Sequence, residues 1–314
     1  MSTKNAVAVT ADVVIIGGGI QGLVLQRELA AAGYACVLVT NAPIGAGQTL
    51  HSHGSLDSGT GLVTGALSQT LLAVTVPYLQ RLGVPVRAAD PSFLVVPEPM
   101  LDLLRPAWEA YDYRPEPASP STVPGFEPNA KPLRVHASNV DKRRLVRALA
   151  TGLESRVIGG EVVDASGRAV HVRATDDEEI RIRSGAIVIA AGCGTKRLLA
   201  ETFGIGHRVT DRITYTKMHM ICLRAPADVL PVIGAIVSPE LFVAAHRGEG
   251  GTTWYATPVD PEPTVYDDAP ADAVADVEPA AVAQKPASSP DWCNTLAHRD
   301  PRTGGHGHRQ RRGR

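Results

Sequence analysis

The first forty residues place one helix-forming segment between two apolar runs. Residues 12–16 and 35–39 are short runs rich in β-branched side chains, a pattern typical of strands buried on both faces. Residues 23–32 between them are rich in Leu, Ala, Gln, Arg and Glu, which favour a helix, and Gly33 stands where a helix C-cap is expected. The order strand, helix, strand predicts a βαβ unit that begins a parallel sheet.

Apolar periodicity continues through the middle of the chain. Residues 65–83 and 142–153 predict helices, and residues 101–111 predict a helix that Pro106 breaks. A Gly-, Ser-, Thr- and His-rich stretch at residues 42–62 predicts a loop. Strands, with a hairpin turn at residues 248–251, are predicted at residues 93–96, 156–163, 169–174, 179–182, 185–191, 218–223, 241–245 and 252–257.

Composition and charge exclude several classes of function. The chain has 314 residues, 44% of them hydrophobic, and a net charge of -1, so no general attraction to nucleic acid or to anionic membranes is expected. No apolar stretch is long enough to span a bilayer, and the N-terminus lacks the features of a signal peptide, so a cytoplasmic protein is predicted. No metal site or disulfide framework is predicted, because no C-x-x-C pair occurs among Cys36, Cys193, Cys222 and Cys293.

Residues 261–314 differ in composition from the rest of the chain. Residues 261–290 consist mainly of Ala, Pro, Asp, Val and Glu without periodicity, and residues 298–314 are rich in Arg and His. A disordered tail over residues 261–314 is predicted. A nucleic-acid-binding element is the weaker interpretation, because no aromatic side chains for base stacking alternate with the arginines.

A glycine motif directly follows the first predicted strand. Gly17, Gly19 and Gly22 fit the pattern G-x-G-x-x-G, which permits a tight turn, close approach of a pyrophosphate and close packing of helix on strand. The free N–H groups and the positive end of the helix dipole then point at the phosphates. The predicted cofactor-binding residues here are Gly17, Gly19, Ile20, Gln21 and Gly22. The alternative is a glycine turn of another α/β protein.

The end of the second strand departs from the usual dinucleotide pattern. An acidic residue commonly binds the ribose hydroxyls there, but Thr40 and Asn41 occupy the position. Either can hydrogen-bond ribose, more weakly than a carboxylate does. No basic residue replaces the acid, so a 2′-phosphate is not favoured.

Residues 12–22, the glycine-rich loop after the second strand and the run 186–192 together resemble FAD-dependent enzymes of the D-amino acid oxidase and glycine oxidase family. The resemblance implies an α/β fold: a discontinuous Rossmann-like FAD-binding domain (residues 10–75 and 133–205) and an antiparallel-sheet substrate domain (residues 76–132 and 206–260). It also implies FAD as the cofactor, backbone contacts of the strand around Val162 with adenine, and a second glycine turn at Ala191 and Gly192. The family closes its FAD domain with a further C-terminal strand and glycine turn, which we do not find here, and a truncated chain is one interpretation.

Residues 47–54 resemble the G-x-T-x-H-x-x-G stretch of the dimethylglycine dehydrogenase branch, whose histidine carries the flavin covalently. That resemblance implies that His51 is the residue to which the flavin is covalently attached. There are two alternatives. In the first, His51 and His53 contact the flavin or the phosphates without a covalent bond; in the second, they are loop residues with no role in cofactor binding. The predicted cofactor-binding residues of this loop are Gln48, Thr49, His51, His53 and Gly54.

Substrate-binding residues are predicted from side-chain chemistry. An Arg binds a carboxylate in bidentate fashion, and Tyr hydroxyls assist it. Arg247, beside the glycine-rich hairpin, is the favoured anion-binding residue, and it is predicted to be catalytic together with Tyr215 and His51. The other candidates are His219, Arg224, Trp254 and Tyr255.

The function predicted from these patterns is FAD-dependent oxidation of the C–N bond of a small amine or amino acid, or of the C–OH bond of a hydroxy acid, by hydride transfer to the flavin. The expected partner is the small-molecule substrate, with no nucleic acid and no membrane span, and the oligomeric state is left open. Two alternatives remain: a non-catalytic remnant that binds FAD weakly or not at all, and a NAD-dependent dehydrogenase.

Overall fold

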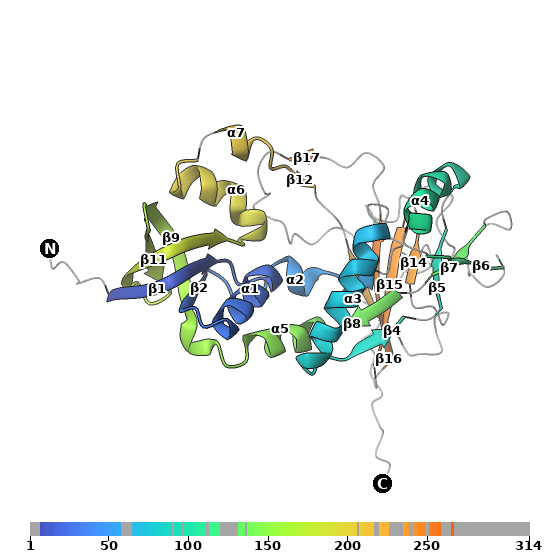
Figure 1. Cartoon of the computed structure of the whole chain (residues 1–314), viewed down its shortest axis with the longest axis horizontal. Coiled ribbons are helices and arrows are strands. Elements are labelled where there is room, and N and C mark those ends of the chain that lie inside the picture. Colours follow the sequence, from blue (N-terminus) through green and yellow to red (C-terminus); the bar gives the residue numbers. More distant parts are fainter. Residues whose placement is uncertain are drawn as a thin grey trace, which may run out of the picture.

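Two halves, each built around β-sheet, lie side by side along the long axis of the molecule, and helix α2 lies between them (Figure 1). The protein is described by a computed structural model. It describes residues 7–57, 65–89, 91–95, 97–110, 113–119, 131–135, 137–205, 207–216, 220–225, 235–238, 241–248, 251–258 and 265–266.

The N-terminal half contains a closed barrel of mixed strands. Its strands, in hydrogen-bonding order, are β1 (Val7–Ile16), β11 (Glu179–Ile189), β10 (Ala169–Ala174), β9 (Val157–Ser166) and β2 (Cys36–Thr40). Strand β1 is parallel to both β2 and β11, whereas β9, β10 and β11 form an antiparallel meander. The predicted βαβ unit is confirmed, with α1 (Ile20–Ala31) between β1 and β2.

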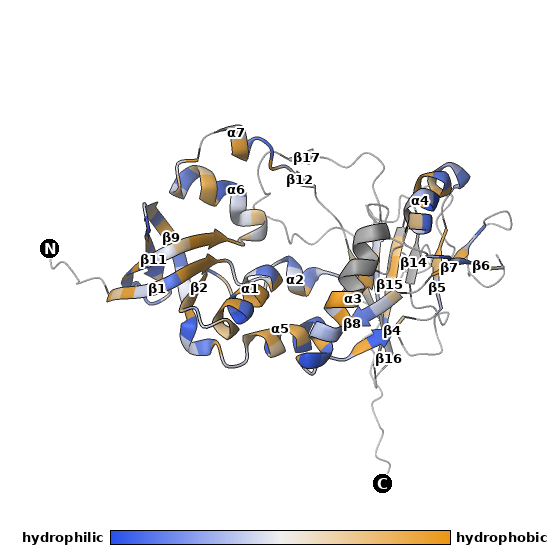
Figure 2. Ribbon diagram, in the orientation of Figure 1, coloured by the Kyte–Doolittle hydropathy of each residue, from blue (hydrophilic) through white to orange (hydrophobic). Residues whose placement is uncertain are grey.

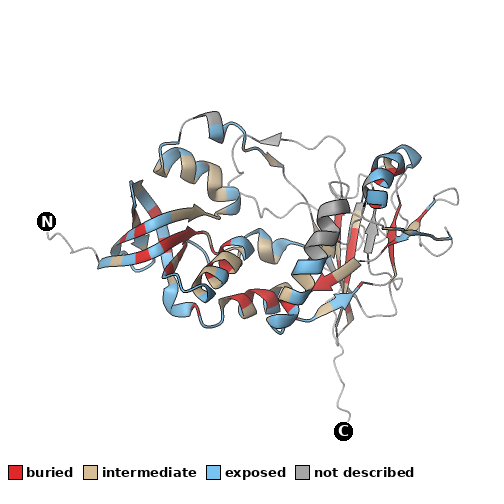
Figure 3. Cartoon of the chain, in the orientation of Figure 1, coloured by how far each residue is buried: buried red, intermediate tan, exposed pale blue. Residues whose placement is uncertain are grey.

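Alternate residues of β1 supply two cores, because successive side chains of a strand point to opposite faces. Val14 and Ile16 pack with Val39 inside the barrel, while Ile15 packs outward against α1 and α5 (Lys142–Ala150). The C-terminal part of β1 and most of β2 are coloured as hydrophobic in Figure 2 and as buried in Figure 3. Each fully buried Val, Leu or Ile side chain contributes about 1.5–3 kcal/mol to this packing.

Helix α5 is defined by a cap and an apolar stripe. Asp141 is its N-cap, and the carboxylate accepts hydrogen bonds from the N–H groups of Arg143 and Arg144 at 2.9 and 3.0 Å. Leu145 and Leu149, one turn apart, are buried against the outer face of the sheet. This position brings the N-terminus of α5 toward the second half of the molecule (Figure 1).

The second half contains a seven-stranded sheet in the order β13-β16-β15-β14-β5-β7-β6. All of its pairs are antiparallel except β14 with β5, so the expected antiparallel sheet contains one parallel pair. The strands are β13 (Ile221–Ala225), β16 (Gly251–Pro258), β15 (Leu241–Gly248), β14 (Ala235–Val237), β5 (Ser92–Leu94), β7 (Leu133–Val135) and β6 (Glu116–Pro117). Helix α3 (Gly65–Arg81) confirms the prediction for residues 65–83.

Smaller elements complete the described residues. A three-stranded sheet has β8 (Ala137–Val140) between β3 (Ser55–Asp57) and β4 (Val86–Ala88). Strand β12 (Tyr215–Thr216) pairs with β17 (Val265–Tyr266). The remaining helical segments are α2 (Gln48–His51), η2 (Glu154–Arg156), η3 (Gly192–Gly194), α6 (Thr195–Arg197), η4 (Leu198–Thr202) and α7 (His207–Thr210).

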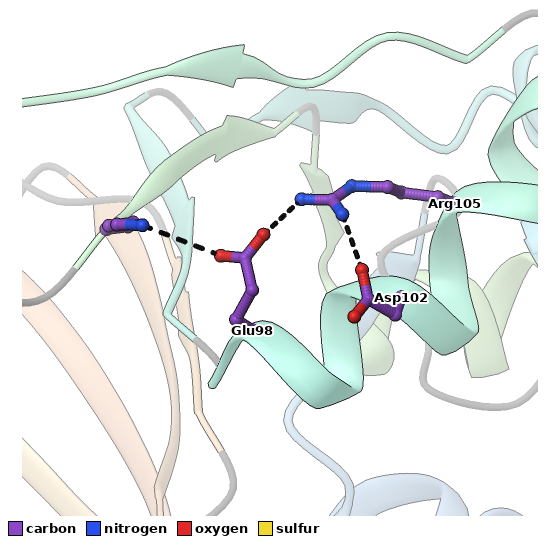
Figure 4. Close-up of polar contacts among 4 residues, drawn as sticks. Glu98, Asp102 and Arg105 are labelled. Carbon is purple, nitrogen blue, oxygen red and sulfur yellow. Dashed lines mark hydrogen bonds and ion pairs between the residues drawn. The ribbon is translucent and has the colours of Figure 1, made fainter.

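The predicted break at Pro106 was wrong. Helix α4 (Glu98–Ala110) runs through Pro106, although proline lacks the N–H that would bond to the carbonyl of Asp102. Arg105 donates to both Glu98 and Asp102 along the two preceding turns, and Lys131 lies near the same Glu98 carboxylate (Figure 4). The hydrogen bond from Arg105 lowers the pKa of Glu98 below its usual value, so the carboxylate stays charged in this arrangement.

Three further expectations required correction. The strands predicted at residues 179–182 and 185–191 are one strand, β11, because both halves pair continuously with β1. The loop predicted at residues 42–62 contains α2 and β3. The disorder predicted for residues 261–314 was wrong for the two residues of β17, and its remainder lies outside the described residues. Within the described part of the chain, no helix has the length and apolarity to cross a membrane.

Candidate functional site

The turn after β1 is built for backbone approach. Gly17 has φ +122°, and a Cβ there would lie 2.2 Å from the carbonyl oxygen of Ala190 at the end of β11. A Cβ on Gly22 would lie 2.0 Å from the carbonyl oxygen of Gly17, so α1 packs directly on the turn. The N–H of Gly17 donates to Val39 at 2.8 Å. Only glycine fits at positions 17 and 22, which supports the reasoning behind the motif.

The N-terminus of α1 fits an anionic ligand. Its N-cap, Gly19, has no side chain to satisfy the first amides, and the first turn holds no acidic residue. Ile20 is 39% exposed, and Gln21 beside it is also exposed. First-turn amides beyond that of Ile20, which donates to Thr49, and the positive dipole end at an exposed surface suit a pyrophosphate, so these residues fit the cofactor that the resemblance implies.

Residues 47–54, here called the histidine loop, begin against this helix end. Thr49 Oγ1 accepts a hydrogen bond from the N–H of Ile20 at 3.0 Å. The N–H of Gly45, just before the loop, donates to Gly18 at 2.9 Å. A Cβ on Gly192 would lie 3.6 Å from Gln48 Oε1, so the second glycine turn also lies beside α2. The structure thus brings together three separately predicted segments: the glycine motif, the histidine loop and the turn after β11.

Thr40 lies at the end of β2, as expected. Its hydroxyl donates to the carbonyl of Ala42 at 2.8 Å, and a Cβ on Gly18 would lie 2.8 Å from Thr40 Oγ1. Because the hydroxyl proton is already donated, Thr40 can only accept a hydrogen bond from a ribose hydroxyl. Asn41 is exposed in the following turn.

The two histidines of the loop differ in environment. His51 is exposed at the end of α2. His53 is half-buried, and its ring centroid lies 4.2 Å from that of Phe242 on β15. The carbonyl oxygen of His53 accepts a hydrogen bond from His246 Nε2 at 2.6 Å. The end of the histidine loop therefore contacts the sheet of the second half.

Other predicted site residues lie apart from one another. Tyr215 is on β12, paired with Tyr266, and its buried hydroxyl has no hydrogen-bond partner among the described residues. Arg247 pairs with Thr252 near the end of the β15–β16 hairpin. Val162 is buried in the barrel core, where it pairs with Val172. His219 lies outside the described residues.

Strand alternation separates the substrate candidates of the hairpin into two faces. Tyr255 is directly opposite Ala244, so it shares a face with His246 and with Phe242, which contacts the histidine loop. Position 247 is on the opposite face of the sheet, together with the buried Trp254. Arg224 pairs with Thr253 on the neighbouring strand. The face directed at the histidine loop therefore includes Tyr255 and excludes position 247.

Three residues at this contact were not predicted from the sequence. Lys142 donates from Nζ to the carbonyl of Ser52, and Nζ lies 4.4 Å from the ring centroid of Tyr255. Asn139 and His246 also join the loop region to the sheet. Lys142 occupies the first position of an amphipathic helix, where a lysine is normally solvated, and nothing in the sequence distinguishes it from its basic neighbours.

Burial shifts the pKa values of the titratable side chains at this contact. Desolvation lowers the pKa of the Lys142 ammonium, and burial also lowers the pKa of His246 below its usual value, against the hydrogen bond to His53. Burial raises the pKa of the Tyr255 phenol, which therefore stays neutral at physiological pH. Among the described residues, no three His, Cys, Asp or Glu side chains are grouped so that they could hold a metal ion.

A curated protein and its crystal structure are similar to this chain. The probable FAD-dependent oxidoreductase PA4991 of Pseudomonas aeruginosa is 29% identical over 276 residues, which cover 79% of this chain and 68% of that protein. Its crystal structure matches with a TM-score of 0.59 at 25% identity, over 90% of this chain and 72% of that one.

More distant structures share the fold. Glycine oxidase from Geobacillus kaustophilus has a TM-score of 0.62 at 18% identity, covering 81% of this chain and 73% of that one. L-proline dehydrogenase from P. horikoshii has a TM-score of 0.64 at 14% identity, covering 79% and 70%. The family model for FAD dependent oxidoreductases (DAO) matches residues 12–284. The chain therefore belongs to this family of FAD-dependent oxidoreductases, and FAD is its cofactor.

Proposed function

We propose that the protein oxidises the C–N bond of a small amine or amino acid, with the pyrophosphate of FAD at the N-terminus of α1 and the flavin beside the histidine loop. The observation that carries the proposal is the hydrogen bond from Ile20 to Thr49, which fixes the histidine loop at the phosphate-binding helix end. Solved relatives with this fold include a glycine oxidase, an L-proline dehydrogenase and an amino acid oxidase, NikD, which supports a C–N rather than a C–OH substrate.

The chain contributes binding and orientation to this reaction. The first-turn amides of α1 and the glycine turn at residues 17–22 would hold the pyrophosphate, and Gln48, Thr49 and Gly192 would lie along the cofactor. When bound, FAD supplies the acceptor for the hydride. Little acid–base chemistry is then required of the protein, whose main task is to orient the C–H bond toward the flavin and to exclude water.

The remaining site residues stay proposals. His51, which is exposed, is the residue that we propose to contact the flavin. The contact is either non-covalent or a covalent bond between His51 and the flavin. Arg247 and Tyr215 are proposed as substrate residues on the chemistry of carboxylate recognition alone. Their placement adds no support, because position 247 is on the face of the sheet opposite to Tyr255 and β12 is not paired with β15. Residues 10–75 with 133–205, and 76–132 with 206–260, are proposed as the cofactor and substrate domains.

Anaerobic reduction of the flavin tests the proposal directly. The FAD-loaded chain is mixed with a panel of amino acids, secondary and tertiary amines and 2-hydroxy acids, and the visible flavin absorbance is followed. We expect bleaching by at least one amine or amino acid and none by the hydroxy acids. Bleaching by hydroxy acids alone would overturn the C–N proposal, and a chain that retains no flavin would favour the non-catalytic alternative.

Acid precipitation distinguishes the two forms of the His51 proposal. Covalent flavin stays with the protein pellet, whereas non-covalent FAD is released into the supernatant. If His51 carries the flavin covalently, acid precipitation of His51→Ala should release the flavin into the supernatant. His53→Ala, the matched control two residues away, should keep the flavin in the pellet. Flavin that is released from the wild type excludes covalent attachment.

A further inference from the structure

The four residues that follow α2 are held by side chains from both halves of the molecule. Ser52 and His53 offer their carbonyl oxygens to Lys142 and His246, which come from α5 and β15. We call this group of contacts around residues 52–55 the loop junction. Its members come from segments nearly two hundred residues apart in sequence, as the separation of 193 between His53 and His246 shows.

Gly54 is enclosed at the centre of the loop junction. It is buried and has φ +68°, and a Cβ there would lie 2.8 Å from Val140 O, 3.1 Å from Lys142 Cγ and 3.2 Å from His246 Cε1. Its own carbonyl accepts a hydrogen bond from the N–H of Val140 at 2.9 Å. Three separate elements therefore meet at one glycine, and no larger residue fits without moving one of them.

Tyr255 and Asn139 connect these contacts to the sheet. Lys142 Nζ lies over the ring of Tyr255, and the ring of His246 meets the same tyrosine edge-on at 5.2 Å. Asn139 donates to the carbonyl of Ala245 at 2.7 Å and accepts from Ser55 Oγ at 3.1 Å. The buried amide of Asn139 thus bonds to both β3, directly after the histidine loop, and β15. These contacts keep the end of the loop on the face of the sheet that carries Tyr255.

We infer that Lys142 and His246 are positioning residues, which hold the histidine loop against the substrate sheet and so fix where His51 stands relative to the cofactor. The inference rests on the proposed function only for the statement that His51 faces the flavin. Neither residue is assigned to touch the substrate. Both act through the carbonyl groups of Ser52 and His53, at the opposite end of the loop from the Thr49 contact with α1.

The chemistry of the His246 contact allows a sharp test. Nε2 must donate to the His53 carbonyl, because a carbonyl oxygen only accepts. The amide of a glutamine can place a donor near the position of Nε2, whereas leucine fills similar space without a donor. His246→Gln should therefore preserve the contact, and His246→Leu should remove it and leave the His53 carbonyl without its partner.

Hydrogen exchange of the full chain, measured with and without added FAD, reads the loop directly. For peptides covering residues 50–57 we expect His246→Leu and Lys142→Met to speed exchange about tenfold, and His246→Gln to remain near wild type. His171→Leu, a half-buried strand histidine of the barrel, is the control and should leave these peptides unchanged. Peptides of α1 should be unaffected in every variant.

A second readout separates this inference from the proposed function. In the FAD-loaded chain, His246→Leu should change the visible flavin spectrum and slow flavin reduction, and His246→Gln should restore both. Exchange in the loop that stays within about twofold of wild type in His246→Leu and Lys142→Met would overturn the inference, as would equal damage by His246→Gln. Failure of the wild type to bind or reduce flavin would overturn the proposed function. The hydrogen-exchange result obtained without FAD would still test the positioning role of Lys142 and His246.

Discussion

The glycine turn at residues 17–22 and the loop junction are held together by different means, and they contact opposite ends of the histidine loop, at Thr49 and at residues 52–53. At the turn, glycines at positions 17 and 22 let backbone meet backbone at distances that any Cβ would prevent. At the loop junction, Lys142, Asn139 and His246 reach backbone carbonyls with long side chains. Both arrangements join segments that are distant in sequence, Gly17 with Ala190 and His53 with His246. The first depends on the absence of side chains, whereas the second depends on side-chain donors that reach carbonyl groups only when these segments have folded together.

Gly17→Ala should have the largest effect, because it adds both backbone strain and a contact of 2.2 Å with Ala190 O. We expect FAD affinity, measured by fluorescence titration, to fall more than about a hundredfold, or the turn to misfold. Gly33→Ala is the matched control, since Gly33 also has positive φ (+91°) but a Cβ there meets nothing within 4 Å. Equal losses in the two variants would show that strain alone matters, contrary to the geometry.

Asn139→Asp tests the side-chain end of the comparison. The change replaces the N–H donor by a carboxylate oxygen facing the carbonyl of Ala245, at a residue that is 6% exposed. We expect the free energy of unfolding, measured with denaturant, to fall by about 2–4 kcal/mol. Asn41→Asp, in an exposed turn, should change it by less than about 0.5 kcal/mol. An unchanged free energy of unfolding in Asn139→Asp would mean that the buried hydrogen bond contributes nothing to joining the two halves of the molecule.

Thr40→Glu should improve the cofactor site. Thr40 donates its hydroxyl proton to Ala42, whereas a carboxylate at this position can accept hydrogen bonds from both ribose hydroxyls. We expect FAD to bind about tenfold more tightly, with Thr40→Gln giving a smaller gain because its hydrogen bonds are not charge-assisted. Unchanged or weaker binding by Thr40→Glu would place the ribose elsewhere.

The pH dependence of stability sharpens the account of His246 and has the smallest expected effect. Its folded pKa lies below the unfolded value near 6.5, with burial as the main cause and with Lys142, Asp141 and Arg87 as charged neighbours. The unfolded chain therefore binds more protons, so the stabilising contribution is present above about pH 6.5 and is lost as the pH falls toward the folded pKa. Denaturant unfolding should show a steeper loss in wild type than in His246→Gln; parallel curves would contradict the burial of the imidazole.

Much of the fold followed from local patterns. The β1–α1–β2 unit, α3, α5 and the β15–β16 hairpin were predicted because apolar period, glycine positions and caps act within a few residues. Helix α4 continued through Pro106, a case in which tertiary packing of Leu101, Leu104 and Trp108 outweighs a local rule. Strand β11 was predicted as two pieces because its continuity comes from pairing with β1, which the sequence does not display.

The site was predictable to the same extent. The glycine motif could be identified because each of its glycines has a structural reason at a fixed spacing, and the histidine loop was identified from its resemblance to the dimethylglycine dehydrogenase branch. Lys142 and His246 could not, because a lysine at a helix start and a histidine in a strand are common in surface positions. Their roles depend on the register of β15 and β16 and on the approach of α5, both of which are long-range features of the fold.

The measurement that most directly tests the account is the visible spectrum of the full chain after incubation with FAD and removal of unbound cofactor. The account predicts that the protein retains about one flavin per chain and that Gly17→Ala retains almost none, because we propose that the turn at residues 17–22 binds the pyrophosphate. A colourless wild-type protein, or equal retention by Gly17→Ala, would contradict the central claim that this turn and the histidine loop together form the cofactor site.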